Sequence, residues 1–393
     1  MVDGPSDGPG MTPGRGCRII TGMARSVWWG LGVGAGLGAG LGAASAGIGW
    51  FYSSVLLDPT PRPVYPERVL AVGGRSITLA ASRLAAQPGT WGLRWPEGLA
   101  VIGAVTAHGP GEVVRTLLGG DRPAAGTAAV LDTGPFDPDP SARGLAFETV
   151  DVATPLGPSP AWLVPATGDT WVVMVHGRGG SRREALRVLP ALHGLGLPVL
   201  VATYRNDLEA PPSPDGHYHL GDTEWLDVEA AVALARERGA QRIVVFAWSM
   251  GAAITAAFLN RSSHADSVAA LVWDAPLVDW RATLRLQARN RRLPPGLTAF
   301  ATSATRMRIG IDFDHFDLRR RPPAVRPPTL IVHSTEDTAV PVAASRALAA
   351  AASTLDWPIE YLEVPDVEHT AAWNADPDAY ERAVVEFLNR VLR

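Results

Sequence analysis

The sequence contains no lysine and only one cysteine, and both shortages narrow the chemistry open to the protein. All 35 basic side chains are arginines, which we attribute to coding bias and not to mechanism. The single cysteine, Cys17, stands in a stretch rich in Gly and Arg, outside any plausible core. A disulfide within the chain, a cysteine nucleophile and a cysteine-based zinc site are therefore excluded.

Charged residues are also scarce. They make up 19% of the 393 residues, whereas hydrophobic residues make up 47%. A chain of this composition can bury a sizeable core and is not disordered as a whole. The net charge is -4 and no basic stripe recurs along the chain, so nucleic acid is not expected as a partner.

The longest uncharged stretch runs from 26 to 57. Its 32 residues exceed the roughly 20 that a helix needs to cross the core of a bilayer, and aromatic residues stand near both ends. We expect a disordered cytoplasmic tail over 1–25 and a transmembrane segment over 26–57. A cleaved signal peptide is one alternative, because Ala44-Ser45-Ala46 resembles a cleavage site. A buried soluble helix is the other, although so many glycines make a poor helix in water.

Glycine occupies every second position of this stretch from Gly30 to Gly42. On a helix this spacing forms stripes of small residues that let membrane helices approach closely, which suits self-association. Arginines flank the stretch in similar number on both sides, so charge leaves the orientation open. We expect a single-pass protein of the cell membrane whose main domain is extracytoplasmic, because long domains are translocated largely regardless of charge.

Residues 58–145 are predicted to form a linker and a small β-rich region. Short apolar runs broken by Gly and Pro lie at 68–72, 76–80 and 99–105. Residues 119–145 are rich in Asp, Pro and Gly and look like a second linker. No residue in this region suggests chemistry.

From 146 to 393 short apolar runs alternate with segments of helical period. Strands are predicted at 147–152, 161–164, 170–175, 198–203, 242–247, 268–273, 329–333 and 359–364. This alternation predicts an α/β fold, with a mostly parallel sheet covered by helices on both faces. In such sheets the reactive residues lie at the carboxyl ends of the strands.

The clearest motif is Ala247-Trp248-Ser249-Met250-Gly251, which follows a predicted strand and opens a helix. It matches the nucleophile elbow G-x-S-x-G with Ala at the first position. The residues two positions before and after the serine must be small, because the turn is sharp. The motif makes Ser249 the candidate nucleophile, the alternative being a simple helix cap.

The chain from about 146 to 393 resembles the serine hydrolases of the α/β-hydrolase superfamily, in particular the serine-aminopeptidase and prolyl-oligopeptidase-like group. The matching pieces are the elbow at Ser249, the segment His176–Ser181 (HGRGGS), Asp337 in HSTEDTAVP and His369 in VEHT. The resemblance implies a lid insertion at about 277–328, where the strand and helix alternation breaks. It covers neither the apolar stretch nor 58–145.

The resemblance also implies a catalytic triad in the order Ser, acid, His. His369 is the one histidine beyond the last predicted strand, and Asp337 follows the strand at 329–333. Asp274, one strand earlier, is the competing acid. The oxyanion hole is expected to use the backbone N–H groups of Met250 and Arg178.

These residues predict two-step acyl transfer to water, in which an ester, thioester or amide is cleaved through an acyl-enzyme. The expected substrate is a small-molecule or peptide acyl compound, and no metal or organic cofactor is required. A peptidase or acyltransferase with the same triad is the nearest alternative, and Glu209, Asp215 and Glu224 are candidates for reading a substrate amine. A non-catalytic membrane-tethered binding protein is the other alternative.

Overall fold

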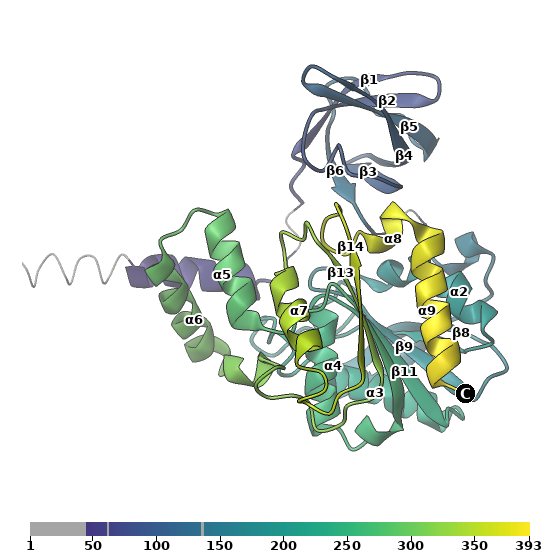
Figure 1. The fold of residues 1–393 in the computed structure, drawn as a ribbon, viewed down its shortest axis with the longest axis vertical. Coiled ribbons are helices and arrows are strands. Elements are labelled where there is room, and N and C mark those ends of the chain that lie inside the picture. Colours follow the sequence, from purple (N-terminus) through teal and green to yellow (C-terminus); the bar gives the residue numbers. More distant parts are fainter. Residues whose placement is uncertain (1–44, 61–62, 135–136) are drawn as a thin grey trace, which may run out of the picture.

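The computed structural model describes residues 45–60, 63–134 and 137–393. These residues form a small closed β-barrel, a larger α/β domain and a helix that precedes both. Figure 1 shows the barrel at one end of the molecule, against α8 (Ala372–Ala375), and the first helix at another side, next to α6 (Pro295–Ile309).

The α/β domain is built on an eight-stranded sheet in the order β14-β13-β12-β11-β9-β10-β8-β7. The strands are β7 (Glu148–Thr154), β8 (Gly157–Val164), β9 (Thr170–Val175), β10 (Val199–Val201), β11 (Arg242–Trp248), β12 (Val268–Asp274), β13 (Thr329–Ser334) and β14 (Ile359–Val364). All pairings from β10 to β14 are parallel, and β8 and β7 are added antiparallel at one edge. The predicted α/β class and mostly parallel sheet are therefore present.

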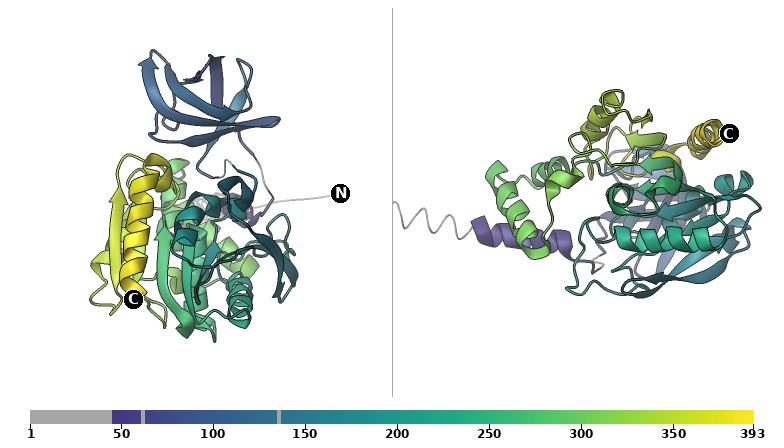
Figure 2. Two further views of the ribbon diagram at one scale, coloured as in Figure 1. Left: turned by 90° about the vertical axis from the view of Figure 1, so that its right-hand side faces the viewer. Right: turned by 90° about the horizontal axis from the view of Figure 1, so that it is seen from below.

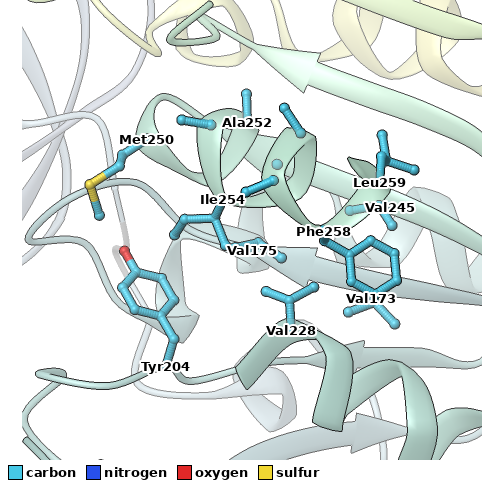
Figure 3. Close-up of a cluster of buried hydrophobic side chains, with 14 of the residues drawn as sticks. Val173, Val175, Tyr204, Val228, Val245, Met250, Ala252, Ile254, Phe258 and Leu259 are labelled. Atoms are coloured by element: carbon cyan, nitrogen blue, oxygen red, sulfur yellow. The ribbon is translucent and has the colours of Figure 1, made fainter. Parts of the chain in front are cut away.

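Helices cover both faces of this sheet. One apolar core cluster joins the sheet to α3 (Trp225–Glu237), α4 (Met250–Arg261) and α7 (Val342–Ala350), and Figure 3 shows part of it between α4 and the strands. A second cluster joins the opposite face to α2 (Leu189–Gly194) and α9 (Pro377–Val391). Central strands such as β9 are buried on both sides, which explains their continuous apolar sequence.

The sequence has a helical period over 181–193, but the structure does not form one continuous helix there. The helical period over 181–193 is divided into a 3-10 helix, η2 (Arg182–Arg187), and α2. Pro190 lies in the first turn of α2, the only part of a helix that tolerates its missing N–H. A new helix therefore begins at Leu189.

Between β12 and β13 the chain leaves the sheet and forms α5 (Trp280–Asn290) and α6, followed by a 3-10 helix, η4 (Phe313–Phe316). The carboxylate of Asp279 caps α5 by accepting from the amide of Ala282. Residues 275–328 are called the helical insertion below. They coincide with the stretch in which a lid was expected.

The barrel contains six strands in the order β1-β2-β5-β4-β3-β6. They are β1 (Glu67–Val72), β2 (Ser76–Ala80), β3 (Trp91–Trp95), β4 (Gly98–Gly109), β5 (Glu112–Gly120) and β6 (Ala128–Asp132). β6 lies inside 119–145, which the sequence indicated as a linker, and it pairs with both β1 and β3. That interpretation was wrong because a five-residue strand carries too little pattern to stand out among Gly and Pro.

Residues 45–57 form a helix that packs along α6. A side chain at Gly49 would stand 2.7 Å from the Cβ of Phe300, so this close approach requires glycine. Ser53 and Leu57 are fully buried, and the hydroxyl of Thr305 donates to Ser53 Oγ at 3.1 Å. The end of the predicted membrane segment is therefore integrated into the α/β domain.

The rest of the predicted transmembrane segment, 26–44, lies outside the described residues, as do the predicted tail, 1–25, and the glycine stripe. In the part of the chain that the structure describes, no helix has both the length and the apolar character needed for a membrane crossing.

Candidate active site

Ser249 occupies the turn between β11 and α4. Its backbone has φ 50° and ψ -117°, a conformation that costs energy for a residue with a side chain and that is typical of functional sites. A Cβ at Gly251 would collide with the carbonyl oxygen of Val175, and one at Gly177 would stand 3.1 Å from Ser249 Cβ. The small residues of the motif therefore let the elbow pass close to β9 and to the loop that follows it.

His369 and Asp337 are directly paired. His369 Nδ1 lies 2.6 Å from Asp337 Oδ2, and the two residues come from the loops after β14 and β13. Asp337 Oδ1 accepts from the amides of Ala339 and Val340 at 2.7 and 2.8 Å. Four hydrogen bonds in all, including one from His333, hold this carboxylate in place.

The charge states follow from these partners. Burial raises the pKa of Asp337, but the charge of His369 and the hydrogen bonds from His333 and His369 outweigh it, so the pKa lies well below its usual range. Burial lowers the pKa of His369, and the negative charge of Asp337 more than reverses this effect. Asp337 is therefore ionised and stabilises an imidazolium at His369.

Asp274, the competing acid, has a different partner. Its Oδ2 accepts from the hydroxyl of Tyr380 at 2.9 Å, and it makes no hydrogen bond to His369. Burial raises the pKa of Asp274 to about 6, despite the opposing charge of Arg187. Burial thus disfavours the charge of Asp274 at the end of β12, whereas Asp337 is the carboxylate that contacts the imidazole.

Ser249 and His369 border one cavity of about 320 Å³. Their side chains form no hydrogen bond to each other in this uncomplexed structure. Catalytic hydrogen bonds in free enzymes are often long and tighten only when substrate binds. Met250 and Arg178 line the same cavity, so four of the five predicted site residues border one space. The fifth, Asp337, does not line the cavity and contacts His369.

Met250 is the first residue of α4, so its N–H has no carbonyl partner within the helix. Arg178 lies in the loop after β9. Its guanidinium donates to the carbonyls of Val55, Leu56 and Asp58 at 2.9–3.3 Å. Arg178 thus connects the end of helix 45–57 to the loop in which the second oxyanion donor is predicted.

His176, which directly follows β9, also contacts this loop. Its Nε2 lies 2.8 Å from Asp207 Oδ2, its Nδ1 lies 2.8 Å from the Gly177 carbonyl, and its ring stacks on Tyr204. Both ring nitrogens face acceptors, which suits a protonated imidazole. Burial lowers the pKa of His176, and the charge of Asp207 more than offsets it.

The barrel contacts the loop that carries His369. Glu368 Oε1 accepts from the amides of Thr338 and His369 at 2.6 and 3.0 Å, and its other oxygen pairs with Arg83 of the barrel. The side-chain oxygen of Gln87 accepts from the Glu368 amide at 2.9 Å. Glu368 therefore links the loop after β13, which carries Asp337, to the histidine loop after β14, which carries His369. It also links both loops to the barrel.

A buried arginine fixes the barrel side of this contact. Arg115 is fully buried and donates to the carbonyls of Gly103, Ala85, Gln87 and Gly89. Burial lowers its pKa to about 10. These bonds set the shape of the 85–89 loop, which carries Gln87 to the histidine loop.

Several of these residues escaped the sequence prediction. His333 has no role in the predicted site, yet its Nε2 lies 3.0 Å from Asp337 Oδ2 and its Nδ1 lies 2.8 Å from Ser345 Oγ. Its spacing of four from Asp337 is the one available signal. Nothing in the pattern of Arg83, Gln87 or Arg115 points toward the loops of Asp337 and His369, which lie more than 200 residues away.

The remaining candidates lie apart from the site. Glu209 pairs with Arg182, Asp215 with His219, and Glu224 is buried against backbone amides at His219 and Gly221. None of the three lines the cavity. The described residues contain no cluster of His, Cys, Asp and Glu that could hold a metal ion.

Known proteins match separate parts of this chain. Residues 214–393 match the prolyl oligopeptidase family, and residues 68–132 match a domain of unknown function (DUF8805). The uncharacterized protein Rv2307c of Mycobacterium tuberculosis strain H37Rv is 28% identical over 261 residues, which cover 64% of this chain and 80% of that protein. The uncharacterized protein MT2364 of strain CDC 1551 gives the same values.

Among solved structures, the esterase Pf2001 of Pyrococcus furiosus superposes with a TM-score of 0.53 at 20% identity, over 66% of this chain and 98% of the esterase. A second crystal form gives 0.53 at 21% identity, over 65% and 95%. The α/β domain therefore has the α/β-hydrolase fold. Together with the match over 214–393, this makes the chain a serine hydrolase.

Proposed function

We propose that the chain hydrolyses carboxylic esters, with Ser249 as nucleophile, His369 as general base and Asp337 as the acid that orients it. The observation that carries this proposal is the 2.6 Å contact between His369 Nδ1 and Asp337 Oδ2 beside a cavity that Ser249 also borders. The strained backbone of Ser249 at the start of α4 supports the same role.

The proposed reaction has two halves. His369 Nε2 takes the proton of Ser249 Oγ as the oxygen attacks the ester carbonyl, and the N–H groups of Met250 and Arg178 stabilise the oxyanion. The imidazolium then gives its proton to the departing alcohol, which leaves an acyl-serine. Water attacks this ester with His369 as base again, and the acid and the free serine are released.

The cavity favours an ester over a peptide with a free amine. Among the residues that the structure describes, no carboxylate lines it, and the three carboxylates that were candidates for reading an amine have other partners. A substrate ammonium would lose its water without gaining a counter-charge. The family match to prolyl oligopeptidases keeps amide cleavage as the alternative that an assay must test.

Membrane attachment through the apolar stretch 26–57 is part of the proposal, with the α/β domain outside the cytoplasm at the cell membrane. Its support is the uncharged sequence of the stretch and its aromatic ends. Because residues 45–57 pack on α6, the membrane-spanning part would end near residue 45.

A fluorophosphonate probe tests the nucleophile. The probe is expected to label the chain, and Ser249→Ala is expected to abolish labelling, while Ser334→Ala, a change at a buried serine of β13, serves as control. Turnover of p-nitrophenyl esters but not of aminoacyl p-nitroanilides supports the esterase. Labelling that persists in Ser249→Ala contradicts the proposal.

A further inference from the structure

The cavity beside Ser249 is closed by elements outside the core of the fold. Helix 45–57 contributes Tyr52, Val55 and Leu56 to its wall, and α5 and α6 supply much of the remainder, including Leu284, Leu297 and Ala301. The hydrolytic centre thus opens into a space whose walls are mainly apolar. A cavity of about 320 Å³ lies at the lower end of the range for small-molecule sites, roughly 300–1,000 Å³.

A shallow groove continues from this cavity toward the surface. It is lined by Gly47, Ile48, Phe51, Tyr52, Leu293, Pro294 and Leu297. Tyr52, Leu293 and Leu297 border both spaces. The groove therefore joins the cavity to the face formed by helix 45–57 and the turn between α5 and α6, which Figures 1 and 2 show on a side of the molecule away from the barrel.

Large apolar side chains are exposed on helix 45–57 and on α6, the two helices beside the groove. Of the ten such side chains in the described residues, six lie on helix 45–57 and α6: Ile48, Trp50, Phe51, Val55, Phe300 and Met307. Met307 is 75% exposed and Phe51 60%. An apolar group of this kind on one face marks an interaction site.

The charge of the face identifies its partner. Residues 280–310 contain seven arginines and no Asp or Glu, although the whole chain carries a net charge of -4. Arg285, Arg289, Arg291, Arg292 and Arg306 are exposed there. Arginines beside exposed Trp, Phe and Met side chains suit the interface of an anionic lipid bilayer.

The chain that adjoins this face points to the same partner. Residues 26–44, directly before helix 45–57, contain no charged residue and read as a membrane segment. We propose that helix 45–57 and the helical insertion form a docking face for an anionic lipid bilayer, and that the cavity behind it binds the aliphatic acyl chain of a lipid ester. The second half of this inference rests on the proposed esterase function.

Docking would place the groove at the level of the acyl chains. A lipid ester could then slide its chain through the groove into the cavity and bring its carbonyl to Ser249 without crossing water. Each methylene buried in the cavity is expected to raise kcat/KM about three- to fourfold until the space is full. The preference for chain length is therefore a property of helix 45–57 as well as of the helical insertion.

The docking half is tested with the full chain reconstituted in vesicles of phosphatidylcholine and phosphatidylglycerol. In a Cys17→Ser background, Met307→Cys carries a fluorescent label, and Leu208→Cys, an exposed leucine far from this face in sequence, serves as matched control. Lipids spin-labelled on the acyl chain are expected to quench the label at 307 and not at 208. Phe300→Cys provides a second position should the first variant fold poorly.

The acyl half is tested with p-nitrophenyl esters from acetate to laurate. The ratio of kcat/KM for laurate to that for acetate is expected to exceed 100, and Val55→Trp, which fills the cavity from helix 45–57, is expected to lower this ratio at least tenfold. Leu208→Trp is expected to leave the ratio unchanged. Fluorophosphonate labelling of Ser249 in each variant shows whether its active site is intact.

The outcomes separate the two proposals. Labelling of Ser249 with a flat chain-length profile overturns the acyl pocket and leaves the esterase standing, whereas absence of labelling in the unmodified chain overturns the esterase. Equal quenching at 307 and 208 overturns the docking face. A label at 307 that is shielded from water but not quenched by lipid indicates a second copy of the chain in place of the bilayer, and also overturns it.

Discussion

Two regions outside the eight-stranded sheet reach the candidate active site, and they do so in different ways. The barrel contacts the loops of Asp337 and His369 through Arg83 and Gln87, and its apolar core also includes Val367 and Ala371 on either side of His369. Helix 45–57 contacts the oxyanion loop through Arg178 and otherwise presents apolar side chains to the cavity. The barrel thus borders the proposed acid and base, and the helix borders the cavity in which we propose that the substrate binds.

The largest effect is expected for Asp337, the proposed acid, whose loop contacts the barrel. Asp337→Asn should lower kcat/KM about 10³- to 10⁴-fold, because the amide cannot stabilise the imidazolium and can hold His369 in the wrong tautomer. Asp274→Asn is the matched control and should stay within about threefold of the unmodified chain. Ester hydrolysis under steady-state conditions measures both, and an equal loss in the two variants would reverse their roles.

The second largest effect is expected for Glu368, which contacts the barrel and the loops of Asp337 and His369. Glu368→Ala should lower kcat about 10- to 100-fold with little change in KM, because it frees the Thr338 and His369 amides and displaces the imidazole. Glu368→Gln keeps one accepting oxygen, so its kcat should lie between those of Glu368→Ala and the unmodified chain. Glu336→Ala, at the exposed neighbour of Asp337, is the control. A change confined to KM would show that the barrel does not position His369.

Loss of the contact between Arg178 and helix 45–57 should change KM. Arg178→Ala keeps the backbone N–H but removes three hydrogen bonds to the end of helix 45–57, so KM for long-chain esters should rise about tenfold. Arg183→Ala, at an exposed arginine of η2, should change little. A loss in kcat alone would mean that the side chain serves the oxyanion loop and not the helix.

The pH profile separates the two regions further. His369 must be neutral to act as base, and its pKa is raised above its usual value of about 6.5, so kcat/KM should rise with pH through a midpoint above that value. Removing the charge of Asp337 should lower the midpoint, since the imidazolium loses its partner. Changes in helix 45–57, such as Val55→Trp, should leave the midpoint in place.

The smallest effect concerns the seam between helix 45–57 and α6. Ser53→Ala removes an acceptor from Thr305 Oγ1 and Arg308 in a buried position, and should lower the free energy of unfolding by about 1 kcal/mol. Thermal unfolding measures the shift, with Ser303→Ala on the exposed side of α6 as control. An unchanged melting temperature would mean that the helix is not held by this bond.

Much of the α/β domain was predictable because its signals are local. A buried strand, a sharp turn of small residues and a helix follow one another within 242–261. That order alone indicated Ser249 as the candidate nucleophile. The acid and base could be ranked because they follow strands, and strand ends share one edge of a parallel sheet. The barrel was only partly predictable, since β6 is short and its pairing partners are distant in sequence.

The sequence by itself determined the fold class and the candidate nucleophile, because each depends on residues close together in the chain, and the family resemblance supplied the order of the other candidate groups. Only the tertiary structure decided that Asp337 and not Asp274 contacts His369, that the barrel contacts the histidine loop, and that helix 45–57 lines the cavity. Those contacts join residues many positions apart. Their energies depend on burial and hydrogen-bond geometry, which a one-dimensional pattern does not record.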